Sequence, residues 1–332
     1  MPSPALFFET MNAFQRTAAL RAALELNVFT SIAEGHQTSA ALALHCRAAE
    51  RGMRILCDYL TVLGFLLKSG YEYALTEDSD AFLNRNSPAC VAAAAEFWGS
   101  KMQRETYEDL ASAVRKGGTI VSELGNTEAE HPVWVKYARG MAPVAALTAP
   151  SVAKLVGAEK GEPWKVLDIA AGHGMYGISV AKLNPQARIV AIDWAPVLEV
   201  ARENAEKAGI ADRYRTIAGS AFDEDLGEGY DVALITNFLH HFDPSTCEAF
   251  LKRVFHALKP GGRAVTVEFV PNDDRVTPGP DAAFSLAMLA STPAGDAYTF
   301  AEYRRMFANA GFSSSEMHRM KERSCATIIS TK

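Results

Sequence analysis

The sequence lacks the features that mark several large classes of protein. Its five cysteines form no CxxC pair, show no metal-ligand spacing and are odd in number, so we expect reduced thiols and no bound metal. No apolar run approaches the ~20 residues that a membrane-spanning helix requires. The first residues, Met1-Pro2-Ser3-Pro4, have neither the basic nor the apolar stretch of a secretory signal. We therefore expect a cytoplasmic protein without a membrane segment.

Basic residues are also too few for a typical nucleic-acid-binding surface. The net charge is −6, and the chain has no basic block or tail. Proteins that bind a phosphate backbone normally present a cationic face, so we expect no nucleic-acid partner. The chain has 332 residues, of which 48% are hydrophobic and 22% charged, which is enough material for two ordinary globular cores.

The first half of the chain has a mainly helical pattern. Residues 38–67 predict a short helix, a turn at 46–49 and a longer helix that ends before Lys68-Ser69-Gly70, and residues 71–76 alternate like a short strand. Before them, one helical face is predicted from an apolar stripe of Leu20, Ala23, Leu24 and Val28. Helix, turn, helix and strand is the outline of a winged helix.

A winged helix can bind DNA or can serve only for packing and dimerisation. Within residues 1–100, acidic side chains outnumber basic ones, which opposes binding to phosphate. We therefore favour a dimerisation module. A transcriptional regulator that uses a nucleoside site as a sensor stays as an alternative.

From residue 161 the pattern changes to alternating strands and helices. Strands are predicted at 166–169, 188–193, 230–235 and 264–269, with helices at 196–208 and 245–258 among the segments between them. This alternation predicts an α/β fold, a Rossmann-like parallel sheet with helices on both faces, closed by a hairpin that includes 326–330. We divide the chain into residues 1–100, a helical linker at 101–160 that contributes to an acceptor pocket, and residues 161–332.

The strongest motif is a glycine-rich loop after the first of these strands. Gly172, Gly174 and Gly177 follow the strand and precede a helix, so the backbone can approach a ligand closely and open N–H groups can bind a polar or anionic group. Asp193 ends the next strand, about twenty residues on, where a carboxylate can accept hydrogen bonds from both ribose hydroxyls. Together they predict a nucleoside site.

Three features favour S-adenosylmethionine over NAD as that nucleoside. Asp168 lies within the strand, where a buried acid needs a partner such as a cationic aminocarboxypropyl group. Nothing further along resembles the second mononucleotide-binding half of a dehydrogenase. The segment after the strand at 230–235 supplies a histidine pair, His240-His241, suited to proton removal. An NAD-dependent oxidoreductase stays as the weaker alternative, because the loop also fits the dinucleotide fingerprint.

Several segments besides the glycine loop carry a family resemblance. They are Asn237-Phe238-Leu239-His240-His241-Phe242-Asp243, Leu258-Lys259-Pro260-Gly261-Gly262-Arg263, Glu268, residues 288–295, Tyr298-Thr299, Glu302-Tyr303 and Ala310-Gly311-Phe312. With residues 166–174 and Asp193, they make the sequence resemble the small-molecule O-methyltransferases of the caffeate and hydroxyindole type. The resemblance covers nearly the whole chain. It implies a seven-stranded class I methyltransferase domain behind a winged-helix dimerisation domain, and hence a homodimer.

The resemblance also implies catalytic roles. His241 matches the family's general base, with His240 as the adjacent alternative, and Glu268 matches the carboxylate that orients the base. The family's second acid would fall near Ala297, so this chain lacks it, and Asp296 and Asp243 are the available substitutes. That departure leaves C- or N-methylation open beside O-methylation. The sequence shows no carboxylate cluster suited to metal-assisted transfer.

Cofactor and acceptor contacts are expected around these groups. For S-adenosylmethionine, and its product S-adenosylhomocysteine, the expected contacts are Asp168, Gly172, Gly174, Asp193, Trp194, Ser220 in place of the family's adenine-binding acid, Ala221, Phe222 and Asn237. For a small aromatic or polyketide-like acceptor of secondary metabolism, the expected walls are Trp134, Tyr137, Met141, Phe238 and Met288. The sequence does not name the acceptor.

Overall fold

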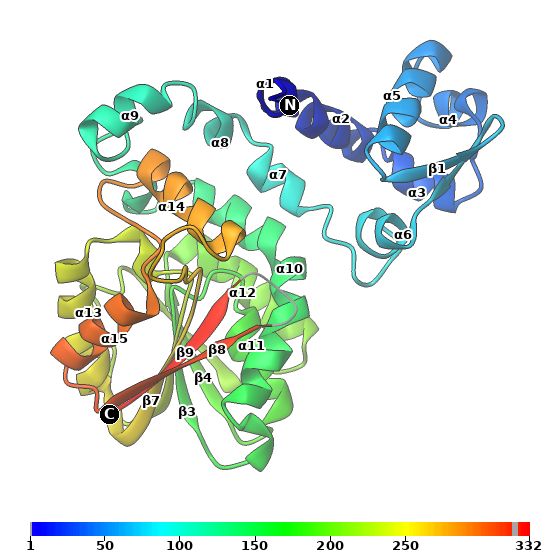
Figure 1. The fold of residues 1–332 in the computed structure, drawn as a ribbon. Helices are drawn as coiled ribbons and strands as arrows, with labels where there is room; N and C mark the ends of the chain where they lie inside the picture. The colour runs from blue at the N-terminus through cyan, green and yellow to red at the C-terminus, as the bar shows by residue number, and fades with distance from the viewer. Residues whose placement is uncertain (1, 321–324) are drawn as a thin grey trace. The chain divides into compact units, whose positions relative to one another are not determined.

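A computed structural model describes residues 2–320 and 325–332 (Figure 1). The chain folds into two compact units, Met1–Lys101 and Met102–Lys332. Of the linker predicted at residues 101–160, residues 102–160 are grouped with the second unit. Among the described residues, no helix is both long enough and apolar enough to cross a membrane.

The first unit consists of short helices and one hairpin. Its elements are α1 (Ala5–Met11), α2 (Ala13–Glu25), α3 (Val28–Ala33), α4 (Ser39–His45), α5 (Glu50–Val62), β1 (Leu66–Ser69), β2 (Glu72–Leu75), α6 (Glu77–Leu83), α7 (Ala94–Trp98) and the start of α8 (Lys101–Glu105). Thr38 caps α4 by accepting a hydrogen bond from the Ala41 N–H at 3.2 Å. The buried core contains Phe29, Leu42, Met53 and Leu60. Helix, turn, helix and the strand β2 follow one another in the order that the sequence predicted, and β1 pairs with β2 in a hairpin that was not predicted.

One boundary in this unit was predicted wrongly. The longer helix was expected to continue through Leu67, but α5 ends at Val62. Gly64 adopts φ +85°, and the Phe65 N–H bonds back to the Leu60 carbonyl at 2.9 Å, which is a typical glycine stop. Leu66 then pairs with Leu75 across an antiparallel hairpin. Leu66 is apolar and falls on the helical spacing of the residues before it. The sequence pattern therefore placed it in the helix, although it belongs to a strand.

The second unit is built on a seven-stranded sheet in the order β5-β4-β3-β6-β7-β9-β8, which confirms the predicted fold class. The neighbouring pairs from β5 to β7 are parallel, and β9 runs antiparallel to both β7 and β8. The strands are β3 (Lys165–Ile169), β4 (Arg188–Asp193), β5 (Tyr214–Ala218), β6 (Tyr230–Thr236), β7 (Leu258–Glu268), β8 (Ser314–Arg319) and β9 (Ala326–Thr331). The predicted closing hairpin is therefore present.

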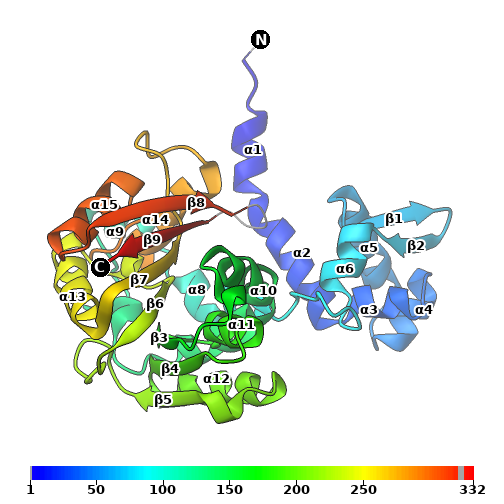
Figure 2. The same ribbon diagram turned by 90° about the horizontal axis from the view of Figure 1, so that it is seen from below.

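Helices cover both faces of this sheet (Figures 1 and 2). On one side lie α10 (Val133–Leu155), α11 (Met175–Leu183) and α12 (Ala195–Lys207), and on the other α13 (Pro244–Ala257) and α15 (Phe300–Asn309). Val166 of β3 joins the first core, while Leu167 and Ile169 join the second. Burial on both faces explains why the parallel strands are almost continuously apolar. The second unit also contains the rest of α8, α9 (Leu110–Lys116) and α14 (Gly279–Ser291).

Candidate active site

The glycine loop joins β3 to α11 at the carboxyl edge of the sheet. Gly172 and Gly174 have φ +58° and +73°, values that glycine adopts without strain. Gly174 must also be small, because a Cβ there would lie 2.6 Å from the Tyr214 hydroxyl oxygen. It forms the N-cap of α11, which begins at Met175. The sequence therefore specifies a tight turn whose backbone faces the space above β3.

Asp193 ends the neighbouring strand β4 and is bonded to this loop. Its Oδ2 accepts a hydrogen bond from the Gly172 N–H at 2.8 Å, and its Oδ1 accepts one from the Trp194 N–H at 2.7 Å. Burial raises the pKa of the carboxyl to about 6, against the opposing effect of these two hydrogen bonds. Asp193 also lines the cavity described below, so a carboxylate is held at the cavity wall beside the glycine turn.

Asp168 is buried within β3, as the sequence suggested, and it is bonded to the backbone of the next helix. It is only 1% exposed and does not line the cavity. Its Oδ2 accepts a hydrogen bond from the Gly177 N–H at 3.1 Å, one turn into α11. Desolvation raises the pKa of this carboxyl to about 8, more than the Gly177 hydrogen bond lowers it. Its observed contact therefore supports the loop from below.

A single cavity brings together most of the predicted site residues. The predicted residues that line it are Gly172, Asp193, Trp194, Ser220, Ala221, Phe222, Asn237, Phe238, His241, Trp134 and Tyr137. The predicted residues that do not are Asp168, Gly174, Glu268, Met141 and Met288. Met141 and Met288 are instead buried, at 2% and 5% exposure. The cavity thus joins the nucleoside motif, the histidine turn and the start of α10.

Other lining residues were not identified from the sequence. They are Asn126, Thr127, Ala170, Ile192, Val197, Gly219, Thr236 and Phe242. Ile192 and Thr236 stand at strand ends next to recognised motifs, so the strand pattern could have located them. Asn126 and Thr127 belong to a 3-10 turn, η1 (Gly125–Thr127), for which the sequence carries no chemical signal.

His241 reaches the cavity from a 3-10 turn, η4 (Leu239–His241), that follows β6. Its Nδ1 lies 3.1 Å from the Phe238 carbonyl oxygen. Since a carbonyl can only accept, Nδ1 carries the proton and Nε2 is left as a hydrogen-bond acceptor. Burial, reinforced by the neighbouring His240, holds the pKa of His241 well below its usual value. The ring is therefore neutral at neutral pH, and the Trp134 ring lies edge-on to it at 5.2 Å.

Glu268 contacts His240 and not His241, the partner that the sequence analysis expected. Its Oε2 accepts from the His240 Nδ1, and its Oε1 accepts from the Phe238 and Leu239 N–H groups, each at 3.0 Å. The reason is the turn itself, because successive residues of η4 point in different directions. Glu268 is fully buried and fixes the backbone of the turn through these hydrogen bonds. His241 lies on the cavity side, with its ring centroid 4.2 Å from that of His240.

Neither proposed substitute for the missing second acid is directed at the histidines. Ala297 is fully buried at the position of that acid. Asp296 pairs with Arg275 at 3.0 Å. Asp243 caps α13, accepting from the Thr246 N–H at 3.1 Å. Burial alone would raise the pKa of Asp243, but its hydrogen bonds from Ser245 and Thr246 outweigh burial and lower it to about 2.

Aromatic rings form the remaining walls of the cavity. Phe222 packs edge-to-face on Phe242 at 4.9 Å and lies 5.8 Å from Phe238, and its N–H donates to the Ser220 hydroxyl at 3.2 Å. On the other side, the Trp134 indole N–H donates to the Asn126 carbonyl at 3.0 Å and the ring lies 5.8 Å from that of Tyr137. Such walls suit flat, largely apolar ligands with a few polar groups.

Comparison with known proteins agrees with this geometry. Residues 107–313 match the model of an O-methyltransferase domain, and residues 8–85 match that of an O-methyltransferase dimerisation domain. A crystal structure from Nostoc punctiforme, provisionally described as an O-methyltransferase, is 52% identical, with a TM-score of 0.95 and 100% coverage of both chains.

Two further relatives have more specific descriptions. Human N-acetylserotonin methyltransferase, solved in complex with S-adenosylmethionine, is 25% identical with a TM-score of 0.86, covering 99% of this chain and 97% of that one. The tetracenomycin polyketide synthesis 8-O-methyl transferase of Streptomyces glaucescens is 27% identical over 304 residues, covering 91% of this chain and 89% of that protein. These matches confirm the resemblance identified from the sequence.

Proposed function

We propose that this chain, which belongs to the O-methyltransferase family, methylates a hydroxyl of a small aromatic or polyketide-like acceptor. We propose His241 as the general base. The chain is an S-adenosylmethionine-dependent O-methyltransferase by its family match and its relatives. The observation that carries the proposal is that one cavity is lined by the Gly172 turn, Asp193 and His241 together.

The polar and apolar groups around Asp193 in the cavity fit S-adenosylmethionine, which would supply an electrophilic methyl group. We assign Asp193 to the ribose hydroxyls, because its carboxylate reaches the cavity wall while its hydrogen bonds to Gly172 and Trp194 hold it in place. Phe222 and Trp194 supply apolar surface for the adenine, and Ser220 a hydroxyl in place of an acid. Asp168 supports the turn from below through Gly177.

In this proposal the Nε2 atom of His241 removes the proton of the acceptor hydroxyl. The Phe238 carbonyl holds the proton on Nδ1, so Nε2 can accept the proton of an acceptor hydroxyl that lies in the cavity. Because burial keeps the ring neutral, the base is available without prior deprotonation. A low pKa makes it a weak base towards a phenol of pKa about 10, so we expect proton transfer to accompany methyl transfer rather than to precede it.

The acceptor side of the cavity supports a flat substrate. Trp134, Tyr137 and Phe238 contribute aromatic surface, and acceptor binding between them would exclude water from the reacting groups. The named relatives act in serotonin-derived and polyketide chemistry, which fits a hydroxylated fused or indolic ring and a role in secondary metabolism.

The test is a screen of phenolic and indolic acceptors with isotopically labelled S-adenosylmethionine, followed by location of the transferred methyl group. We expect labelled methyl on oxygen, and label on carbon or nitrogen would refute the assignment of the acceptor atom. With a substrate in hand, His241→Ala should lower kcat by about 10²–10⁴ while S-adenosylhomocysteine still binds. If His240→Ala produces that loss and His241→Ala does not, the base is His240.

We also propose that the protein is a homodimer assembled through its N-terminal unit. The match to a dimerisation domain supports this, and so does an exposed apolar surface on the first two helices formed by Leu6, Phe7, Phe8, Met11 and Phe14. Light scattering coupled to size-exclusion chromatography should report a dimer. The double variant Phe7→Ser/Phe14→Ser should shift it towards monomer, whereas Val276→Ser, at an equally exposed residue of the other unit, should not.

A further inference from the structure

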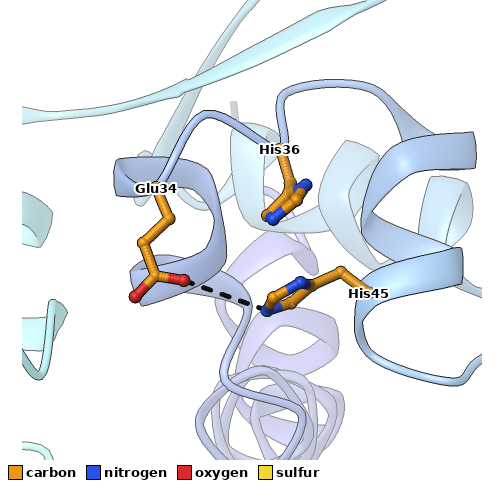
Figure 3. Close-up of side chains that lie close together, drawn as sticks. All are labelled: Glu34, His36 and His45. Carbon is orange, nitrogen blue, oxygen red and sulfur yellow. Dashed lines mark ion pairs between the residues drawn. The ribbon is translucent and has the colours of Figure 1, made fainter.

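Three potential metal ligands, none of which was identified as a site residue from the sequence, meet on the surface of the N-terminal unit (Figure 3). They are Glu34, which follows α3, His36 two residues later, and His45, the last residue of α4. One ligand atom from each lies within 4.8 Å of the others. Figure 3 shows the Glu34 carboxylate directed towards His45, with the His36 ring lying over the His45 ring.

Hydrogen bonds and packing on the core fix the backbone that carries these side chains. The Glu34 N–H donates to the Thr30 carbonyl and the His36 N–H to the Ser31 carbonyl, each at 3.0 Å. Beneath them, Ile32 of α3 and Leu42 of α4 belong to the buried core of this unit. The positions of the three Cα atoms are therefore set by the fold, while the partly exposed side chains of Glu34 and His45 have room to change rotamer.

The contacts of these three side chains already place possible metal ligands close to one another. The Oε1 atom of Glu34 accepts a hydrogen bond from the Asn86 amide at 3.2 Å, which leaves Oε2 facing His45 Nε2 at 3.9 Å. Such a hydrogen bond to the second carboxylate oxygen is the kind of support that orients metal ligands. The two imidazole rings lie 4.0 Å apart with an interplanar angle of 29°.

The donor types and distances favour zinc. Two imidazole nitrogens and one carboxylate oxygen are ligands that Zn²⁺ accepts readily, whereas Ca²⁺ and Mg²⁺ favour oxygen alone. With metal–ligand bonds of about 2.0–2.2 Å, two ligands of a tetrahedral ion lie roughly 3.4 Å apart. The Glu34–His45 separation of 3.9 Å is close to that value, and both side chains are about two-fifths exposed, so rotation can close the difference.

We propose that Glu34, His36 and His45 form a binding site for one Zn²⁺ ion, with water as the fourth ligand. The ion links the end of α3 to the end of α4 across the intervening turn. It therefore stabilises the helix–turn–helix of the N-terminal unit and takes no part in methyl transfer.

The experiment is titration calorimetry of Zn²⁺ into the full-length, untagged and metal-stripped protein, with far-UV circular dichroism to verify folding. We expect one ion per chain and a higher unfolding temperature when zinc is present. Each of Glu34→Gln, His36→Ala and His45→Ala should weaken binding by at least about tenfold. These residues are on the surface, so the variants should remain folded.

Two control variants distinguish this site from other sources of zinc affinity. His318→Ala removes a surface histidine that lies 3.9 Å from Glu316, the same spacing as the Glu34–His45 pair but without a second imidazole, and should leave binding unchanged. Cys46→Ser removes the thiol next to His45 and should also leave it unchanged. The proposal is overturned if no stoichiometric binding occurs, if His36→Ala and His45→Ala retain it, or if Cys46→Ser abolishes it.

Discussion

Glu268 offers the sharpest test of how the histidine turn is held. The carboxylate accepts hydrogen bonds from three donors, the Phe238 and Leu239 N–H groups and the His240 ring, and it has no exposed surface. Glu268→Ala removes all three acceptor contacts at once. Leaving a buried donor unsatisfied costs about 1–3 kcal/mol, so we expect about 3 kcal/mol or more of destabilisation at the turn.

Glu268→Gln is the matched control. Its amide oxygen can still accept from the two backbone N–H groups, and the His240 ring can change tautomer so that Nδ1 accepts from the new amide N–H. We therefore expect it to cost about 1 kcal/mol, the net value of one ordinary hydrogen bond. The two variants separate anchoring of the turn, which glutamine preserves, from any requirement for the carboxylate charge.

Hydrogen exchange of the Phe238 and Leu239 amides measures the effect locally. Each 1.4 kcal/mol corresponds to about a tenfold change in an equilibrium constant, so Glu268→Ala should speed exchange of both amides by roughly a hundredfold or more. Glu268→Gln should change it by less than about tenfold. Equal exchange in the alanine variant and the wild type would refute the anchoring role. Strong loss of turnover in Glu268→Gln with normal exchange would show that the charge itself is needed.

Two further predictions follow from the site, and a third variant, in the other unit, is the control for the second of them. In the proposed role of Asp193, S-adenosylhomocysteine should bind more weakly as pH falls through about 6, approaching a tenfold loss per unit, because a protonated carboxyl could not accept from both ribose hydroxyls. Asp193→Asn should flatten this dependence in calorimetry. Gly177→Ala places a Cβ 2.6 Å from the Asp168 Oδ2 and should destabilise the protein to urea by about 1–3 kcal/mol. Gly52→Ala, in helix α5 with nothing within 4 Å of the added Cβ, should be neutral or stabilising by up to about 1 kcal/mol, and a loss equal to that of Gly177→Ala would contradict the steric argument.

The meeting of the Gly172 turn with Asp193 could be predicted because both are local features of the sequence. The glycine turn follows its strand directly, and Asp193 stands at the end of the next strand. In a parallel sheet these ends lie at the same edge. Strand period and turn chemistry were therefore sufficient to bring Gly172 and Asp193 together, and the structure joins them by a hydrogen bond of 2.8 Å.

The histidine turn shows where such reasoning fails. The family resemblance implied that Glu268 orients the general base, with His241 as the first candidate and His240 as the alternative, and the carboxylate binds His240. Which of two adjacent rings meets a carboxylate depends on the dihedral angles of a single 3-10 turn, and sequence spacing does not encode them. The same holds for Met141 and Met288, whose apolar character fits a cavity wall and a buried core equally well.

The amino-acid sequence alone determines the order of the two units, the α/β class and the glycine turn after β3, since each depends on short-range periodicity and on residues only a turn apart. Only the tertiary structure determines which side chains that are far apart in the sequence lie in contact or line the same cavity. Trp134 meets His241, Asn126 reaches the cavity, and Glu34 lies beside His45, because packing of whole helices and loops sets those distances.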